Sequence, residues 1–213
     1  MYKVSADSSI FSPFILTINS DIKKKNEILP YLLTKLPFTS VILYTETNDE
    51  ISFQKNITDL IPLIQSFNTA ALVADHTRVA GRTSADGIYL EKNLDQYEIL
   101  KQKDKNIIGI GNMTSRHQSL EWGEKQPDFI FFGKLNHDNK PKAHARNIAL
   151  SEWWAELIEI PCVIQAGNHP DSLAAAAKTG ADFIAIENML FDNPIESIIE
   201  VCQKFLQNYK DIY

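Results

Sequence analysis

The feature that most constrains the fold of this chain is an eightfold recurrence of short apolar runs, each followed by a polar or amphipathic stretch long enough for a helix. The runs are rich in β-branched and aromatic residues, which favour strands. Runs such as FILTI, IIGI, FIFF and FIAI also lack polar alternation, which is typical of parallel strands buried on both faces. We expect strands at 13–18, 39–44, 70–74, 87–90, 107–110, 129–132, 162–165 and 183–186.

The stretches between these strands predict helices, with Ser115 and Asn193 as N-caps and Pro194 in a first helical position. Gly180 is expected to end a helix shortly before the last strand. Eight β-α units with short turns favour a closed (β/α)8 barrel, or TIM barrel, over an open doubly wound sheet. We therefore expect 1–213 to form a single domain of the α/β class. The expected helices are 23–36, 51–67, 77–82, 95–103, 115–124, 149–158, 170–179 and 194–209.

Composition and charge limit the class of protein. The 213 residues are 44% hydrophobic and 23% charged, which are values of a globular chain with a sizeable core. The net charge of −6 argues against nucleic acid as a partner, because such binding depends on Lys and Arg that neutralise phosphates. The sequence has neither a signal-peptide pattern at its start nor an apolar stretch of the ~20 residues that a membrane helix needs, so we expect a soluble, cytoplasmic protein without a membrane partner. Cys162 and Cys202 lie in apolar runs and are predicted to be reduced and structural.

Four segments with motif-like residues follow predicted strands, where barrel enzymes place their active sites. The segments are ALVADHTRVAGRTSADGIYLEKN, IIGIGNMTS, PDFIFFGKLNHDNKPKAHARN, and IPCVIQAGN with GADFIAIEN. In order and spacing they resemble the thiamine phosphate synthase family, which includes a thiazole tautomerase branch, over residues 14–206. The best anchor is the pair Asp75 and Asp86, which lie 11 residues apart, as in the family.

The resemblance implies a transferase of thiamine biosynthesis that joins a pyrimidine pyrophosphate to a thiazole phosphate and expels pyrophosphate with the help of Mg²⁺. Its partners would then be phosphorylated small molecules. Asp75 matches a family magnesium ligand and is a candidate catalytic residue. The second family carboxylate falls on Leu94, so Asp95 is the candidate metal ligand in its place. A second interpretation of Asp75 is an N-cap for the helix that follows it, and the two roles are compatible.

Several family contacts are replaced in this chain. Tyr44 stands where the family has an Arg that binds pyrophosphate, Ala74 replaces an Asn, and Gly111 replaces a Ser. Each replacement removes a hydrogen-bonding partner, which predicts weak binding of Mg²⁺ and pyrophosphate. The candidate substrate-binding residues are Tyr44, Tyr89, Lys92, Gly111, Gly133, Lys134, Gly167, Asn168, Glu187 and Asn188.

The loop after the sixth predicted strand, 133–147, is rich in basic residues. Lys140 lies near the family Lys that holds pyrophosphate and is a candidate catalytic residue. A basic loop at a barrel mouth attracts anions, and the alternative is a solvated, mobile loop. Glu187 also has two interpretations, a carboxylate that faces the site and repels phosphate, or a surface residue that caps or forms a salt bridge at the barrel rim.

Three functional hypotheses follow from these residues. The first is a thiamine phosphate synthase with an altered site. The second is a tautomerase-like or otherwise diverged enzyme that keeps the barrel pocket without magnesium-pyrophosphate chemistry. The third is a catalytically silent barrel that binds a small molecule or a partner protein, because a fold does not by itself fix a function. The sequence leaves the oligomeric state, monomer or homo-oligomer, open.

Overall fold

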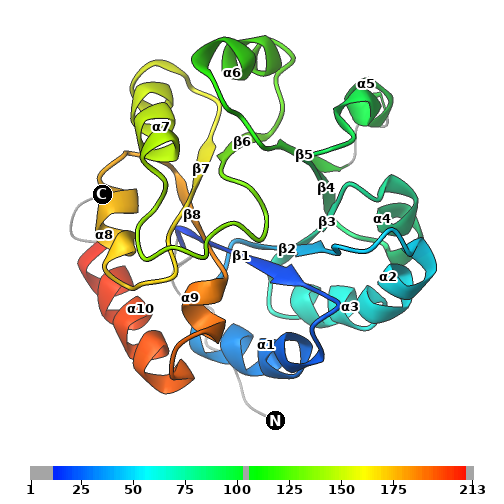
Figure 1. Ribbon diagram of the computed structural model, residues 1–213. Helices are drawn as coiled ribbons and strands as arrows, with labels where there is room; N and C mark the ends of the chain where they lie inside the picture. The colour runs from blue at the N-terminus through cyan, green and yellow to red at the C-terminus, as the bar shows by residue number, and fades with distance from the viewer. Residues whose placement is uncertain (1–11, 103–105, 210–213) are drawn as a thin grey trace.

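Eight parallel strands close into a barrel in the order β1 to β8, ringed by helices (Figure 1). This computed structural model describes residues 12–102 and 106–209. The predicted (β/α)8 architecture is confirmed, and only the first two strands begin one residue later than expected. The strands are β1 (Phe14–Asn19), β2 (Ser40–Tyr44), β3 (Ala70–Ala74), β4 (Gly87–Leu90), β5 (Ile107–Ile110), β6 (Phe129–Phe132), β7 (Cys162–Gln165) and β8 (Phe183–Ile186).

The helices follow the predicted order, with several differences. The helix expected over 95–103 begins as a short 3-10 helix at 94–96, before the α-helix at 97–101. The helix expected over 51–67 is split, because Pro62 has no N–H to donate to the Thr58 carbonyl in a continuous helix. The helix before β7 begins four residues early, at Ala145, and a short helix that was not predicted follows β8. The helices are α1 (Lys23–Lys35), α2 (Glu50–Ile57), α3 (Leu60–Gln65), α4 (Thr77–Thr83), η1 (Leu94–Gln96), α5 (Tyr97–Lys101), α6 (Arg116–Gly123), α7 (Ala145–Leu157), α8 (Ser172–Ala177), α9 (Asn188–Phe191) and α10 (Ile195–Tyr209).

The helix ends show which capping predictions are correct. Ser115 is confirmed as the N-cap of α6, since its side chain accepts a hydrogen bond from the Gln118 N–H at 3.2 Å. Gly180 adopts a φ of +76° after α8, a conformation that costs glycine little. The prediction for Asn193 is wrong, because α10 begins at Ile195 and the Asn193 amide instead donates to two carbonyl oxygens.

Aspartates at the amino ends of three strands hold neighbouring strands in register. The carboxylates of Asp86, Asp128 and Asp182 accept hydrogen bonds from backbone N–H groups of β3, β5 and β7 at 2.7–2.8 Å. These bonds provide a partner for backbone N–H groups at the amino-terminal end of the barrel, which the hydrogen bonds between strands leave without one. The amino-terminal end is thus fixed by structural carboxylates, and the opposite end is left for a site.

The core has two layers. The larger one packs the outer face of the strands against the helices, and there Trp154 is fully buried with its ring edge against Phe132. The inner layer fills the barrel itself with Tyr89, Phe129, Phe131 and smaller side chains. No helix among residues 12–102 and 106–209 combines the length and apolar character that crossing a bilayer requires.

Candidate functional site

Two adjacent pockets open at the carboxyl ends of the strands, where barrel enzymes build their sites. The carboxylate pocket encloses about 380 Å³ and is lined by Tyr44, Glu46, Asp75, Glu91, Lys92, Lys134, His137 and neighbouring residues. The basic pocket encloses about 260 Å³ and is lined by Gly133, Lys134, His137, Lys140, Lys142, His144, Arg146 and neighbouring residues. Lys134 and His137 line both pockets, so the two pockets are neighbours at the same end of the barrel, and together they are called the mouth.

Asp75 organises the wall of the carboxylate pocket. Its backbone has a φ of 57°, and its Oδ1 accepts hydrogen bonds from the N–H groups of Glu91, Lys92 and Asn93 at 2.9–3.2 Å. The interpretation as an N-cap is wrong, because the N-cap position of α4 belongs to His76 and the Asp75 carboxylate is turned toward the loop after β4. The carboxylate therefore ties the end of β3 to the end of β4.

The side chains around Asp75 decide whether the predicted magnesium site can form. Asp95 is exposed in η1 and is absent from the lining of either pocket, so the structure does not bring it to the mouth beside Asp75. The described residues contain no group of three or more His, Cys, Asp or Glu side chains that fits a metal ion. Magnesium commonly takes one or two carboxylates and completes its shell with substrate phosphates and water. The residues do not fit a cation held by the protein alone, and we derive no step through a metal.

Glu91 is a site residue that the sequence analysis did not single out. It lies at the end of β4 and lines the carboxylate pocket, although it is only 5% exposed. Its Oε2 accepts hydrogen bonds from the Leu135 N–H at 3.0 Å and from the Tyr89 hydroxyl at 3.2 Å. Burial raises the pKa of the Glu91 carboxyl, and the charge of Asp75 raises it further. The available signal was a carboxylate directly after a buried strand.

Glu187 lies inside the barrel end and is fully buried. Lys25 forms an ion pair with it at 2.5 Å, and the hydroxyls of Thr17 and Tyr44 donate to the carboxylate at 2.9 Å. Burial raises the pKa of the Glu187 carboxyl, whereas Lys25 opposes that rise. The rim interpretation is wrong on exposure, because Glu187 is fully buried and its ion pair is internal, although Glu187 does occupy the N-cap position of α9 and does form a salt bridge. Lys25 supplies the counter-charge that the repulsive interpretation lacked.

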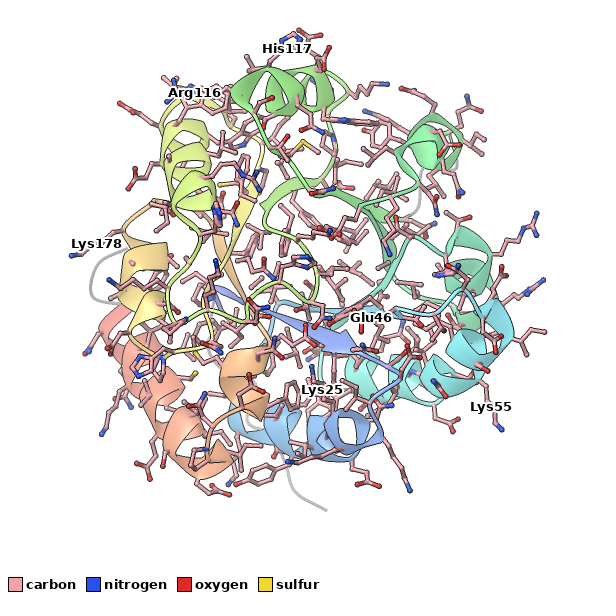
Figure 2. The ribbon with its side chains drawn as sticks, viewed as in Figure 1. Lys25, Glu46, Lys55, Arg116, His117 and Lys178 are labelled. Atoms are coloured by element: carbon pink, nitrogen blue, oxygen red, sulfur yellow. The ribbon has the colours of Figure 1, made fainter. Side chains whose placement is uncertain are left out.

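The burial of Lys25 was not predictable from sequence, because Lys25 ends a run of three lysines that is typical of a solvated helix face. The structure turns it toward the strands, whereas Lys55 and Lys178 project outward from the ring of helices (Figure 2). Its ammonium group also lies 4.9 Å from the centre of the Phe191 ring and 3.5 Å from the Asn188 side-chain oxygen. One face of α1 thus contributes a charge to the barrel end.

The segment 133–144, between β6 and α7, crosses the opening of the barrel (Figure 1). The backbone of Lys134 exchanges two hydrogen bonds with the Gln165 side chain, and Asn136 donates to Glu46 at 2.6 Å. Leu135 inserts into the inner layer of the core. The loop is therefore pinned to several strand ends, and its basic side chains line the basic pocket as the anion-attracting interpretation requires.

The remaining predicted residues divide into two groups. Tyr44, Asp75, Lys92, Gly133, Lys134 and Lys140 line the mouth. A second group lies inside the barrel or beneath segment 133–144, and its predicted contacts with a substrate stay predictions; this group is Tyr89, Gly111, Gly167, Asn168, Glu187 and Asn188. Gly111 owes its place to packing, since a Cβ there would meet the Tyr89 hydroxyl oxygen at 1.7 Å.

Comparisons with known proteins agree with this architecture. The family described as "Thiamine monophosphate synthase" matches residues 16–190. A thiamine-phosphate synthase of Erythrobacter litoralis is 30% identical over 138 residues, which are 62% of this chain and 65% of that protein. One of Rhodospirillum centenum is 28% identical over 139 residues, 63% of this chain and 67% of that protein. The chain thus spans about two thirds of the length of these relatives.

Solved structures show the fold alone, because their sequence identity to this chain is low. A thiamine phosphate pyrophosphorylase from Pyrococcus furiosus superposes with a TM-score of 0.76 at 21% identity, over 92% of this chain and 95% of that one. A tryptophan synthase alpha-subunit from the same organism gives 0.63 at 10% identity, over 92% and 98% of the two chains.

Proposed function

Because the chain belongs to the thiamine monophosphate synthase family, we propose that it acts in thiamine biosynthesis on phosphorylated heterocycles at the carboxyl-terminal mouth of the barrel. The reaction joins a pyrimidine pyrophosphate to a thiazole phosphate. The bond between the pyrimidine's methylene carbon and the pyrophosphate oxygen breaks, and pyrophosphate leaves with that electron pair. The thiazole ring nitrogen supplies its lone pair for the new bond to the same carbon. The observation that carries the proposal is the junction of a basic pocket with a carboxylate pocket through Lys134 and His137.

The electrostatics of the mouth suit a reaction that releases an anion. Lys140, Lys142 and Arg146 line the basic pocket, and their positive charges attract an anion and stabilise negative charge on a leaving pyrophosphate. Asp75 and Lys92 line the adjoining space of about 380 Å³, which is within the range of small-ligand pockets. Tyr44 provides a phenol where the family has a guanidinium, so we expect weaker pyrophosphate binding than in relatives that keep the Arg.

The assay is direct. The purified protein is incubated with both substrates, with and without Mg²⁺, and thiamine phosphate is quantified by chromatography after oxidation to its fluorescent form. We expect product with wild type and at least about tenfold less with Asp75→Asn, because a neutral amide weakens the three charge-assisted hydrogen bonds by which the Asp75 carboxylate holds the end of β4 in the pocket wall. The matched control is Asp59→Asn, at an exposed aspartate outside both pockets. No product from folded wild type at stoichiometric protein concentration contradicts the proposal.

A second candidate is a proton-transfer isomerisation of a thiazole carboxylate phosphate, and Glu91 favours it. A buried carboxyl with a raised pKa on a pocket wall suits a group that takes a proton from one atom and returns it to another. In deuterium oxide, wild type would then exchange a substrate proton for deuterium, and Glu91→Gln would not. Exchange without thiamine phosphate formation selects this candidate, and binding of the substrates without either reaction selects a silent barrel.

The remaining expectations belong to the same proposal. We propose a cytoplasmic location and, from the net charge of −6, no nucleic-acid partner. Magnesium enters as a requirement to be tested in the assay, because the chain offers Asp75 and relies on substrate phosphates for further ligands.

A further inference from the structure

Asp138 is an acidic residue buried in the loop that covers the barrel. It lies in segment 133–144 and is only 4% exposed. Both of its carboxylate oxygens accept hydrogen bonds from Asn188, the residue that follows Glu187. Oδ2 accepts a hydrogen bond from the Asn188 backbone N–H at 2.8 Å, and Oδ1 accepts one from the Asn188 side-chain amide at 2.6 Å. A carboxylate is rarely buried without such partners. The protein thus supplies its own anion to the donors after β8.

The same loop also occupies the end of β7. The Asn168 N–H donates to the Lys140 carbonyl at 2.8 Å. At Gly167, an added Cβ would lie 2.5 Å from the Pro141 carbonyl oxygen and 2.6 Å from that of Lys140. The loop backbone therefore rests directly on this glycine, and no atom of a ligand fits between them. Donors after β7 and donors after β8 are both used by one continuous stretch, 138–142.

Asp138 itself lines the basic pocket, and it holds the Asn188 donors that a phosphate group would otherwise use. Lys25 lies 3.5 Å from the Asn188 side-chain oxygen, and it already forms an ion pair with Glu187 at 2.5 Å. Asp138 adds a second buried carboxylate beside Glu187, and the charge of Asp138 raises the pKa of Glu187. A phosphate group that approached these donors with Asp138 in place would meet two buried carboxylates. It gains the donors only if Asp138 leaves.

We infer that Asp138 is a specificity-determining residue that occupies the Asn188 donors as an internal anion, so that a phosphate group binds there only when stretch 138–142 lifts off the barrel. The inference rests on the proposed function in taking the ligand to be a phosphate. It concerns binding alone and does not require that the protein turn over any substrate. If Asp138 served only to fasten the loop, the expected result would be different. Loss of its carboxylate would then loosen the loop without improving anion binding.

The test measures the affinity of the full chain for inorganic phosphate and for inorganic pyrophosphate by calorimetry. Asp138→Asn removes the charge with little change of shape, and the expected result is at least about a tenfold gain in affinity, the scale of one charge-assisted contact. The matched control is Asp171→Asn, whose carboxylate is 92% exposed after β7 and pairs with His169. This control is expected to stay within about twofold of wild type, because exposed charges are screened.

Trypsin cleavage after Lys142 reports the position of the loop in the same samples. Faster cleavage of Asp138→Asn together with tighter anion binding supports the inference. Faster cleavage with unchanged or weaker binding overturns it and leaves Asp138 as a fastening residue. An equal gain in Asp171→Asn also overturns it, since the effect is then one of net charge. If Asp138→Asn fails to fold, Asp138→Ala is measured in its place and judged by the same outcomes. Failure of the proposed function would appear in the synthase assay and leaves these binding outcomes unaffected.

Discussion

Removal of the Lys25 side-chain charge is expected to destabilise the protein strongly, because it leaves Glu187 buried without its cation. Glu187 is fully buried and Lys25 is only 6% exposed, so water cannot replace the lost partner. Breaking a buried ion pair by removing one partner costs about 3–5 kcal/mol, which corresponds to a loss of roughly 6–20 °C in melting temperature for a chain of this size. The change to make is Lys25→Met, which keeps the volume and the contact with Phe191.

The loss of folding stability in Lys25→Met is expected to depend on pH. Burial raises the pKa of Glu187 above its ordinary value of 4.5, so the folded protein binds this proton more tightly than the unfolded chain. The contribution of Glu187 to stability is therefore complete below pH 4.5 and declines as pH rises through the raised pKa. Without Lys25 that pKa rises further. The cost of Lys25→Met should then be largest near neutral pH and should shrink toward about pH 5.

Urea unfolding of wild type and variant, at about pH 5 and about pH 7.5, measures this cost. Lys24→Met is the matched control, because Lys24 is the exposed neighbour in the same helix. The double variant Lys25→Met with Glu187→Gln is expected to recover part of the loss, since no uncompensated charge remains. A cost below about 1 kcal/mol at neutral pH, or an equal cost at both pH values, would refute the buried-pair reasoning.

Three further predictions concern the framework of the barrel. Burial raises the pKa of both thiols, Cys162 and Cys202, to about 12, so neither should react with a thiol reagent near pH 8 until the protein unfolds; rapid labelling of native protein would disprove this. Asp182→Ala removes the acceptor for the Cys162 N–H and should cost about 1–3 kcal/mol in urea unfolding, whereas Asp192→Ala, at an exposed residue, should cost less than about 0.5 kcal/mol. Gly109→Ala would place a Cβ 2.0–2.5 Å from the Phe129 ring and should lower the melting temperature, whereas Gly81→Ala, with nothing within 4 Å, should not; equal effects would contradict the packing argument.

The strands were predictable from sequence because their physical cause is local. Runs such as FIFF and FIAI must be buried on both faces, and a chain that repeats such runs eight times with helices between them closes most simply as a barrel. The helices were less predictable where a single residue overrides periodicity. Pro62 divides one expected helix into α2 and α3, and the His144 side chain accepts from the Arg146 N–H and starts α7 earlier than the apolar pattern suggests.

The chemistry of the mouth was only partly predictable, because it depends on contacts between segments far apart in sequence. Asp75 and the basic residues of segment 133–144 were found from their positions after strands. The partnership of Lys25 with Glu187 spans 162 residues, and that of Asp138 with Asn188 spans 50. No local pattern distinguishes such a buried charge from a solvated one, so these residues emerged only from the folded chain.

The most direct test of the account is to map where a thiazole phosphate binds, using backbone amide signals in nuclear magnetic resonance spectra of the isotope-labelled protein. The account places the ligand at the carboxyl-terminal mouth and requires its phosphate to displace Asp138. The largest shifts on titration are therefore expected at the amides of Asn168 and Asn188 and at those of 138–140 and 142, at lower ligand concentration in Asp138→Asn than in wild type. Shifts confined to the amino-terminal end of the barrel, around Asp128 and Asp182, or no saturable shift in either protein, would contradict it.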